Sequence, residues 1–333
     1  DDVIDVCAHR VSPAFGSRSA SSSPHVVDLE HSVQGGAHEG PGGASGAAQR
    51  FLSGGFSNGR DRRDYKLFIP SCAGQRPMPL VVMLHGCTQD PDDFAAGTAM
   101  NDLAQARGFY VLYPAQSRRA NPQGCWNWFK HSHQQRGRGE PAVLAGMTRQ
   151  VIADHNIDSQ RVYVAGLSAG GAMAAILGDT YPDLFAAVGV HSGLASGSAS
   201  DLPSALSAMK GAPRPATSAP SGVPTIVFHG DADATVHLRN GEQVIAACTG
   251  DTATVEVTAV QGPGVRNATR AIYRDVKGQI IAEQWTVHGT AHAWSGGRVH
   301  GTYTDRRGPD ASEEMLRFFL EHPKAAATTS ESS

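Results

Sequence analysis

Two serines occupy the pattern G-x-S-x-G, which can place a nucleophile on a tight turn, and these are Ser57 and Ser168. Such a serine is reactive when a buried strand leads into the turn and a helix leaves it, because the strained turn exposes Oγ beside the helix N-terminus. Ser168 lies between the apolar run RVYVA and the helical run AGGAMAAIL, whereas Ser57 lies between AAQRFLSGG and RDRRDYK. We therefore predict that Ser168 is a nucleophile and that Ser57 lies in a loop.

A serine is a weak nucleophile unless a histidine accepts its proton and an acidic side chain orients that histidine. Both residue types follow later runs that are typical of strands. The run TIVFHG leads to Asp231 and Asp233, and the run EQWTV leads to His288 and His292. The order Ser, Asp, His is the one expected on the parallel sheet of an α/β-hydrolase. The residues alone leave both aspartates and both histidines as candidates.

Acyl transfer also requires an oxyanion hole, made of two backbone N–H donors that stabilise the negative charge of the tetrahedral intermediate. One donor follows the nucleophile directly, and the other comes from an early loop after a strand. Ala169 follows Ser168, and the apolar run LVVML ends at His85 and Gly86. We therefore predict that the N–H groups of Ala169 and Cys87 form the oxyanion hole.

Strands must deliver these residues to one edge of a sheet, and the chain contains enough of them. Short apolar runs bounded by Pro or Gly alternate with longer helical segments, which is typical of a mostly parallel sheet with helices on both faces. The predicted strands are 65–70, 79–86, 109–114, 161–166, 186–193, 225–230 and 283–289. The predicted helices are 91–108, 140–156, 169–182 and 311–323. The sequence therefore predicts the fold class α/β, with the α/β-hydrolase arrangement.

The composition divides the chain into three parts. Residues 1–61 include long stretches rich in Ser, Gly and Ala without periodicity, which predict a disordered or loosely attached leader. Residues 62–323 are expected to form one catalytic domain, in which 195–224 is rich in helix breakers and is interpreted as an insertion or cap. Residues 324–333 are expected to form a flexible tail.

Charge and cysteine usage argue against several other classes of protein. The net charge is −3, and no cluster of Lys and Arg is interleaved with aromatic residues, so nucleic acid is not an expected partner. There is no run of eighteen apolar residues, so no membrane span is expected. The five cysteines fit no C-x-x-C pattern, so no metal site is predicted.

Five ordered motifs resemble the esterase family of poly(3-hydroxybutyrate) depolymerases, which is related to feruloyl and acetylxylan esterases: LHGCTQ, CWNWF, GLSAGGAM, HGDADATVH and HAWSGG. The resemblance covers roughly residues 62–323. The family's acid lies in H-G-x-x-D-x-x-V, which implies Asp233 rather than Asp231. Its histidine precedes A-W-S-G-G, which implies His292 rather than His288. Asp231 would then brace its turn, and His288 would be an ordinary residue at a strand end.

The resemblance also implies a disulfide between Cys87 and Cys125, which would stiffen the oxyanion loop. The alternative is two free thiols in a cytosolic enzyme. Cys72 and Cys248 are a weaker second pair. Because aromatic faces bind apolar ester chains, Trp126 and Trp294 are expected to line the acyl or polymer groove. For Trp128, a position in the core is at least as strong an interpretation as a position in the groove.

The expected function is a serine esterase that hydrolyses polyhydroxyalkanoate (3-hydroxybutyrate) polymer or oligomer esters through an acyl-enzyme, without a cofactor. One alternative is a carbohydrate esterase of the feruloyl or acetylxylan type. An alternative of another class is a non-catalytic binding protein on a hydrolase fold, against which the intact Ser, Asp and His argue. A disulfide would favour an extracellular or periplasmic location over a cytoplasmic one. The oligomeric state is left open.

Overall fold

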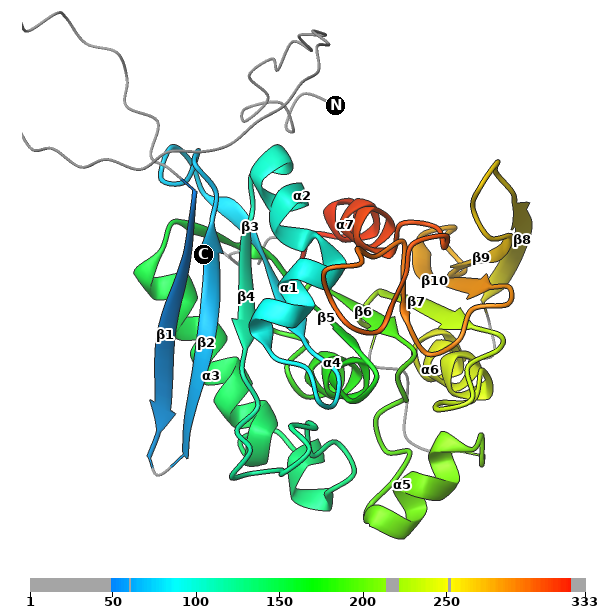
Figure 1. Ribbon diagram of the computed structural model, residues 1–333, viewed down its shortest axis with the longest axis horizontal. Helices are drawn as coiled ribbons and strands as arrows, with labels where there is room; N and C mark the ends of the chain where they lie inside the picture. Colours follow the sequence, from blue (N-terminus) through cyan, green and yellow to red (C-terminus); the bar gives the residue numbers. More distant parts are fainter. Residues whose placement is uncertain (1–48, 60, 214–221, 251–252, 325–333) are drawn as a thin grey trace, which may run out of the picture.

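The computed structural model describes residues 49–59, 61–213, 222–250 and 253–324 (Figure 1). Their centre is a ten-stranded sheet in the order β1-β2-β4-β3-β5-β6-β7-β10-β9-β8. Its strands are β1 (Arg50–Asn58), β2 (Asp61–Ile69), β3 (Met78–Leu84), β4 (Tyr110–Pro114), β5 (Ile157–Leu167), β6 (Ala187–His191), β7 (Thr225–Gly230), β8 (Thr254–Val260), β9 (Ala268–Arg274) and β10 (Ile280–Val287). A separate pair consists of β11 (Trp294–Ser295) and β12 (Thr304–Asp305).

The six central strands are parallel, and an antiparallel pair flanks them at each side. Parallel pairing runs from β4 through β3, β5, β6 and β7 to β10. The antiparallel pairs are β1–β2 and β8–β9, which lie at opposite sides of the molecule in Figure 1. Every residue of β3, β4, β6 and β7 is buried, as expected where both faces of a sheet are covered. The predicted mostly parallel sheet is therefore confirmed.

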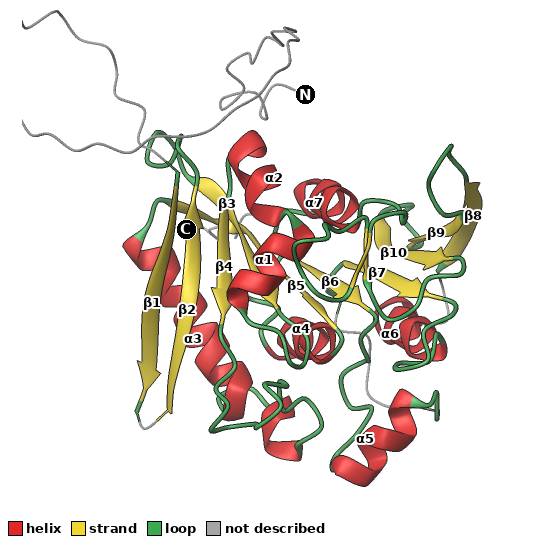
Figure 2. Ribbon diagram, viewed as in Figure 1, coloured by secondary structure: helices red, strands yellow, loops and turns green. Residues whose placement is uncertain are grey.

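Helices cover both faces of this sheet (Figure 2). They are α1 (Pro91–Thr98), α2 (Met100–Arg107), α3 (Gly139–Asp154), α4 (Ala169–Thr180), α5 (Leu202–Met209), α6 (Arg239–Thr249), α7 (Ala311–Glu321) and the 3-10 helix η1 (His131–Gln134). Leu80 and Val82 of β3 belong to the same apolar cluster as residues of α3, α4 and α6. Val81 and Met83 belong to a second cluster with residues of α1, α2 and α7. Successive side chains of β3 thus pack against opposite helical layers, as the pleat requires.

The helix that the sequence predicts over 91–108 is two helices. Ala99 adopts the left-handed conformation, with φ 53° and ψ 22°, between α1 and α2. Its N–H donates to the carbonyl of Ala95 and so closes the last turn of α1. The apolar pattern continues across the break, which is why the sequence predicts a single helix.

The predicted C-terminal boundary of the leader is wrong, because residues 50–58 form β1. This strand pairs with β2 over its whole length, and it contains Ser57, for which the sequence predicts a loop. A Cβ atom on Gly54 would overlap the ring of Tyr65, so glycine makes room for the tyrosine on the paired strand. Packing against Tyr65 therefore explains why this strand contains a glycine, which makes the strand hard to recognise in the sequence. Residues 1–48 of the predicted leader lie outside the described residues.

The predicted insertion and tail are described only in part. The insertion contains α5, and the side chain of Gln134 binds it through the N–H of Gly197 and the carbonyl of Ala199. At the end of α5, the carbonyl of Met209 accepts from the N–H of His237, in the loop after β7. The interpretation of residues 195–224 as an insertion or cap of the catalytic domain stays a prediction. Lys324, the first residue of the predicted tail, donates its N–H to the carbonyl of Gln160, and residues 325–333 lie outside the described residues.

Candidate active site

Ser168 lies on the turn between β5 and α4, at the carboxyl edge of the sheet. Its φ of 59° and ψ of −120° are a conformation that a residue with a side chain rarely adopts. The turn is tight, since a Cβ on Gly166 would overlap the backbone of Gly170, and one on Gly170 would overlap the carbonyl of Leu84. Ser168 is partly exposed at the N-terminus of α4. This is the geometry that G-x-S-x-G predicts.

Asp233, which is buried, and His292, which is partly exposed, form a hydrogen-bonded pair on the loops after β7 and β10. The distance between His292 Nδ1 and Asp233 Oδ2 is 2.7 Å. The second carboxylate oxygen accepts from the N–H groups of Thr235 and Val236, at 2.9 and 2.8 Å. Burial alone would raise the pKa of Asp233, but the hydrogen bond and charge of His292 and the backbone donors lower it. An ionised Asp233 therefore accepts from His292 Nδ1 and directs Nε2 away from itself.

A second aspartate–histidine pair lies nearby and differs in exposure. His288 Nδ1 is 2.8 Å from Asp231 Oδ2, and the N–H of Gly289 donates to Asp231 Oδ1. The two side chains are 44% and 35% exposed, against 12% for His292 and 0% for Asp233. The other ring nitrogen of His288 is 2.9 Å from Thr269 Oγ1. Both nitrogens of His288 are thus engaged, and the pair braces the surface turn after β10.

His191, at the end of β6, connects the turn of Ser168 with the loop of His292. Its carbonyl accepts from the N–H of Ser168 at 2.8 Å, and its Nε2 accepts from the N–H of Ser295 at 2.9 Å. Burial, followed by the charges of His229 and His292, holds the pKa of His191 well below its usual value. No hydrogen bond joins Ser168 Oγ to His292 among the described residues, and in unliganded enzymes this contact is often long. His191 therefore contacts the Ser168 turn through its backbone carbonyl and the His292 loop through its neutral imidazole.

The loop of residues 85–89 follows β3 and lies beside the turn of Ser168. The N–H of Gly86 donates to Gln89 Oε1, and the N–H of Thr88 donates to the carbonyl of Gln123. Neither Cys87 nor Ala169 uses its N–H in a hydrogen bond to another described residue. Both N–H groups predicted for the oxyanion hole are therefore available to a ligand.

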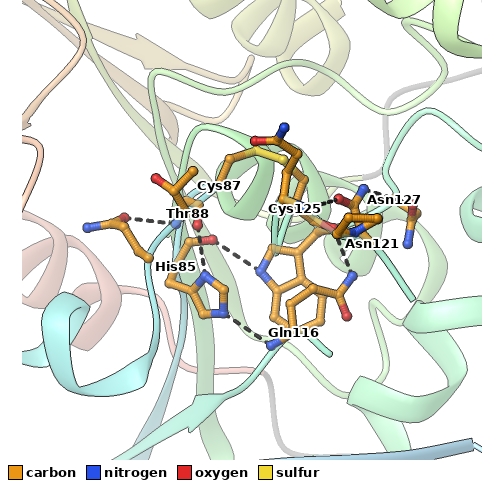
Figure 3. The surroundings of a disulfide bond; sticks show 12 residues. His85, Cys87, Thr88, Gln116, Asn121, Cys125 and Asn127 are labelled. Carbon is orange, nitrogen blue, oxygen red and sulfur yellow. Dashed lines mark hydrogen bonds between the residues drawn. A yellow bond between two sulfur atoms is a disulfide. The ribbon is translucent and has the colours of Figure 1, made fainter. Parts of the chain in front are cut away.

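The disulfide between Cys87 and Cys125 is present, with 4.2 Å between the two Cα atoms (Figure 3). It joins the loop after β3 to the segment that precedes η1, 38 residues further along the chain. The second pairing considered from the sequence is wrong, because Cys248 is a buried free thiol in α6. Burial, the largest influence, raises the pKa of Cys248 to about 12, so the thiol stays protonated and unreactive.

Buried polar groups hold both sides of this disulfide in place. His85 Nε2 accepts from the N–H of Gln116 at 3.1 Å, and Nδ1 donates to the carbonyl of Gly86 at 2.8 Å (Figure 3). The side chain of Gln116 donates to the carbonyl of Cys125 at 2.8 Å. Burial is the main reason that the pKa of His85 is lowered. A neutral His85 thereby couples the loop after β3 to the Cys125 segment.

Glu140, at the start of α3, anchors the Cys125 segment. Its carboxylate accepts from the side chain of Gln116, and both the N–H and the side-chain amide of Asn127 donate to it at 2.7 Å. Burial alone would raise the pKa of Glu140, but the imidazole of His133, 3.5 Å away, and the hydrogen bonds from Gln116 and Asn127 lower it. Sequence patterns do not identify Glu140, His85 or His191 as site residues. The one feature that could have indicated them is that each is a polar residue next to an apolar run.

The two tryptophans that the sequence suggests for substrate binding are both core residues, so that prediction is wrong. Trp126 is 0% exposed and donates its indole N–H to the carbonyl of His85. Trp294 is 1% exposed, stacks on His191 with 5.0 Å between ring centroids, and donates to Ser312 Oγ. Trp128 is also buried. These rings support the site from behind and do not face it.

An exposed aromatic residue near the site is Tyr303, which no sequence motif marks. Its side chain is 46% exposed, and its ring centroid lies 6.4 Å from that of His292, with the two rings nearly perpendicular. Its hydroxyl is 3.3 Å from Thr88 Oγ1. Tyr303 thus extends from the histidine loop to the loop that carries Cys87.

Two other kinds of site are not found among the described residues. They contain no group of three His, Cys, Asp or Glu side chains that could hold a metal ion. None of the helices among them is both long and apolar enough to cross a membrane.

Comparison with known proteins assigns the chain to a family. A family model described as Esterase PHB depolymerase matches residues 63–268. The chain is 33% identical over 235 residues to poly(3-hydroxyalkanoate) depolymerase C of Paucimonas lemoignei, a match that covers 64% of this chain and 54% of that protein. It is 33% identical over 140 residues to feruloyl esterase B of Thermothelomyces thermophilus, a match that covers 42% and 47%. The chain therefore spans about half the length of these curated relatives.

A solved structure supports the fold assignment. The acetyl xylan esterase from Aspergillus awamori is similar with a TM-score of 0.62, over 81% of this chain and 99% of that one, at 18% identity. At that identity the similarity shows the fold alone, which is the α/β-hydrolase fold. With a family model that matches residues 63–268, the chain belongs to the PHB depolymerase esterase family.

Proposed function

We propose that the protein is a serine ester hydrolase in which Ser168, His292 and Asp233 form the catalytic triad. The observation that carries this proposal is the strained turn of Ser168 at the same sheet edge as the hydrogen-bonded pair of His292 and Asp233. The parallel order of β5, β6, β7 and β10 brings the loops after these strands together. The three residue types match the roles of nucleophile, base and orienting acid.

The proposed reaction proceeds through an acyl-enzyme. Ser168 Oγ attacks the ester carbonyl carbon while His292 Nε2 accepts the hydroxyl proton. The oxyanion then accepts hydrogen bonds from the N–H groups of Cys87 and Ala169. When the intermediate collapses, the C–O bond to the leaving alcohol breaks and His292 returns the proton to that alcohol. Water, deprotonated by His292, repeats the attack on the acyl-enzyme and releases the acid and free Ser168.

The surroundings explain why the oxyanion donors need not reorganise. Ala169 begins α4, so the partial positive charge of the helix N-terminus lies beside the oxyanion. Cys87 is held by its disulfide, and the preceding Gly86 is held by the side chains of His85 and Gln89. In other enzymes the loss of one such donor costs roughly 10²- to 10³-fold in kcat.

We further propose that the substrates are esters of hydroxyalkanoic acids, as polymer or oligomer. Support comes from the extent of similarity, since the poly(3-hydroxyalkanoate) depolymerase matches 64% of this chain and the feruloyl esterase matches 42%. The competing assignment is a carbohydrate esterase. Initial rates on 3-hydroxybutyrate oligomers, amorphous polymer films, feruloylated sugars and acetylated xylan separate the two. Faster turnover of the carbohydrate esters would overturn the polyester assignment.

A non-catalytic binding protein is the alternative of another class. A fluorophosphonate probe should label the protein at Ser168, and labelling should be absent in Ser168→Ala. Ser57→Ala is the matched control, because Ser57 occupies the same sequence pattern but lies in the exposed part of β1. Labelling that persists in Ser168→Ala would contradict the assignment of the nucleophile.

We also propose export to an oxidising compartment, in agreement with the disulfide between Cys87 and Cys125. Peptide mapping of protein from its native host, without reduction, should recover the linked pair. Free thiols at both positions would indicate a cytoplasmic location instead.

A further inference from the structure

The hydroxyl groups of Thr88 and Tyr303 meet at the active site, although 215 residues separate them in the chain. Thr88 follows Cys87, whose N–H is the proposed oxyanion donor, and Figure 3 shows it beside the disulfide. Tyr303 presents its ring to His292. The pair therefore lies between the group that binds the scissile carbonyl and the group that protonates the leaving alcohol.

Both residues have backbone conformations that favour glycine. The φ of Thr88 is 67° and that of Tyr303 is 52°, which is uncommon for a β-branched residue and for an aromatic one. Strain of this kind persists only where the surroundings impose it, and it gathers at ligand sites. The strained backbone therefore indicates that the positions of these two side chains serve ligand binding.

The surroundings fix both residues from several directions. Thr88 donates its N–H to the carbonyl of Gln123, and the carbonyl of Tyr303 accepts from the N–H of Trp294 at 2.7 Å. Thr302 donates twice to Asp93, through its N–H and its hydroxyl. The side chain of Gln89 donates to both Asp93 and the carbonyl of Thr302. The histidine loop and the oxyanion loop are thus tied together, and the hydroxyl pair is preorganised.

The pair retains one hydrogen-bond donor for a ligand. At 3.3 Å the contact is longer than the O–H···O distance of about 2.7–2.8 Å that is usual, and within the described chain it is the only hydrogen bond of either hydroxyl. Only one of the two hydroxyl hydrogens can occupy the space between the oxygens, so the other is free to donate. The tyrosine side chain, 46% exposed, adds an apolar ring surface. A free donor beside an apolar ring matches a ligand in which an acceptor lies next to hydrocarbon.

We propose that Thr88 and Tyr303 form a subsite for a second ester group of an oligoester, located in the leaving alcohol. The hydroxyl of Thr88 donates to the hydroxyl oxygen of Tyr303, and the hydroxyl of Tyr303 donates to the carbonyl oxygen of that ester. The ring of Tyr303 packs on the hydrocarbon between the two esters. A hydroxyalkanoate chain carries one such carbonyl in every unit, whereas a simple monoester has none beyond the scissile bond. The inference rests on the proposed ester hydrolysis and adds that the enzyme recognises the neighbouring unit.

The test compares two substrates with the same acyl group. One is the methyl ester of the 3-hydroxybutyrate dimer, whose leaving alcohol contains a carbonyl, and the other is sec-butyl 3-hydroxybutyrate, whose leaving alcohol does not. Chromatography follows the release of methyl 3-hydroxybutyrate or of sec-butanol. Wild-type protein should have the higher kcat/KM on the dimer. Tyr303→Phe should reduce this preference about three- to tenfold, as expected for the loss of one hydrogen bond, and Tyr303→Ala should reduce it further.

Val299→Ala is the control, since Val299 lies in the same loop, is 62% exposed and is placed in neither the triad nor the subsite. It should leave the preference unchanged. An equal loss on both substrates in Tyr303→Phe would indicate a structural role and overturn the subsite, as would an unchanged preference in both Tyr303 variants. If wild-type protein cleaves neither substrate and is not labelled by a fluorophosphonate, the proposed function itself fails, and the subsite fails with it.

Discussion

Replacement of Asp233 by asparagine should lower kcat about 10³- to 10⁴-fold while leaving KM nearly unchanged. The carboxylate accepts the Nδ1 proton of His292 at 2.7 Å, which leaves Nε2 free to accept the proton of Ser168. If the new amide directs its NH₂ group at His292, Nδ1 must become the acceptor and Nε2 carries the proton. That tautomer cannot act as a base, and the corresponding Asp-to-Asn change in a serine protease triad lowers kcat about 10⁴-fold.

The other orientation of the amide is unfavourable for a reason visible in the structure. Its oxygen would still accept from His292, but its NH₂ group would face the N–H groups of Thr235 and Val236. Each buried donor left without an acceptor costs about 1–3 kcal/mol. Because the side chain is 0% exposed, water cannot relieve this penalty. The wrong tautomer is therefore the expected state of the variant.

Asp231→Asn provides the matched control, since Asp231 also follows β7 and also accepts from a histidine, at 2.8 Å. Its side chain is 35% exposed, so water can replace the lost interactions, and kcat should fall less than about threefold. Initial rates on a p-nitrophenyl ester measure both variants, and thermal unfolding checks that each remains folded. A larger loss of kcat in Asp231→Asn than in Asp233→Asn would refute the assignment of the acid.

Three further outcomes follow from the structure. Ser168→Ala should abolish ester hydrolysis with little change in Tm, whereas Ser57→Ala should retain wild-type rates; equal losses would contradict the assignment of the turn. Loss of the disulfide in Cys87→Ser/Cys125→Ser should destabilise the fold by roughly 3–4 kcal/mol, from the 38-residue separation, and lower kcat through the oxyanion loop; unfolding and rate assays that match wild type would argue against both effects. Glu283 is buried in β10 and forms ion pairs with Arg270 and Arg317. Burial alone would raise the pKa values of Glu140 and Glu283, but these two arginines and the donors around Glu140 lower them in the folded state. The contribution of both carboxylates to stability is therefore present above the unfolded value of about 4.3 and is lost as the pH falls through the folded values. Tm should therefore be steady from about pH 7 to 5 and decline below about pH 4, and a shallower decline is expected in Glu283→Gln; a Tm that rises on acidification would contradict this sign.

The proposed catalytic residues can be located in the sequence because they lie at the ends of parallel strands. Each of those strands has a sequence pattern that is typical of a strand, and its carboxyl end must meet the same sheet edge as the others. Ser168 follows β5, and Asp233 and His292 follow β7 and β10. The choice of Asp233 over Asp231 needs the family motif, because local sequence does not reveal which carboxylate becomes buried.

The features that local sequence does not predict, or predicts wrongly, depend on contacts between distant segments. Trp126 and Trp294 lie in the same motifs as site residues, which favours a place in the groove, yet hydrogen bonds to His85 and Ser312 hold both indoles in the core. Strand β1 is hard to recognise because Gly54 lacks a side chain that would indicate a strand, and the reason is the ring of Tyr65 on β2. In each case the residue that makes the deciding contact is distant in the sequence, so a local pattern does not include it.

Contacts between distant segments also order the short turn that carries the proposed oxyanion donor. The N–H of Cys87 is positioned by the disulfide to Cys125, by His85 through Gln116, and by Gln89 through Thr302. These partners come from separate parts of the chain, so the entropy of ordering the loop is lost during folding and not during the reaction. A donor that is already ordered stabilises developing charge without further reorganisation, which is the main physical requirement of an oxyanion hole.

The buried carboxylate of Glu140 fits this interpretation, because it fixes the Cys125 segment through Gln116 and Asn127 and lies behind that segment. Replacement by glutamine keeps the size of the side chain but turns one acceptor oxygen into a donor, which then faces the donors of Gln116 or Asn127. The Cys125 segment should shift, and the N–H of Cys87 should lose its alignment with the developing oxyanion. Glu140→Gln should consequently lower kcat on a p-nitrophenyl ester more than it raises KM, with thermal unfolding as the check that the variant is folded. A change confined to KM would show that the segment contacts substrate instead.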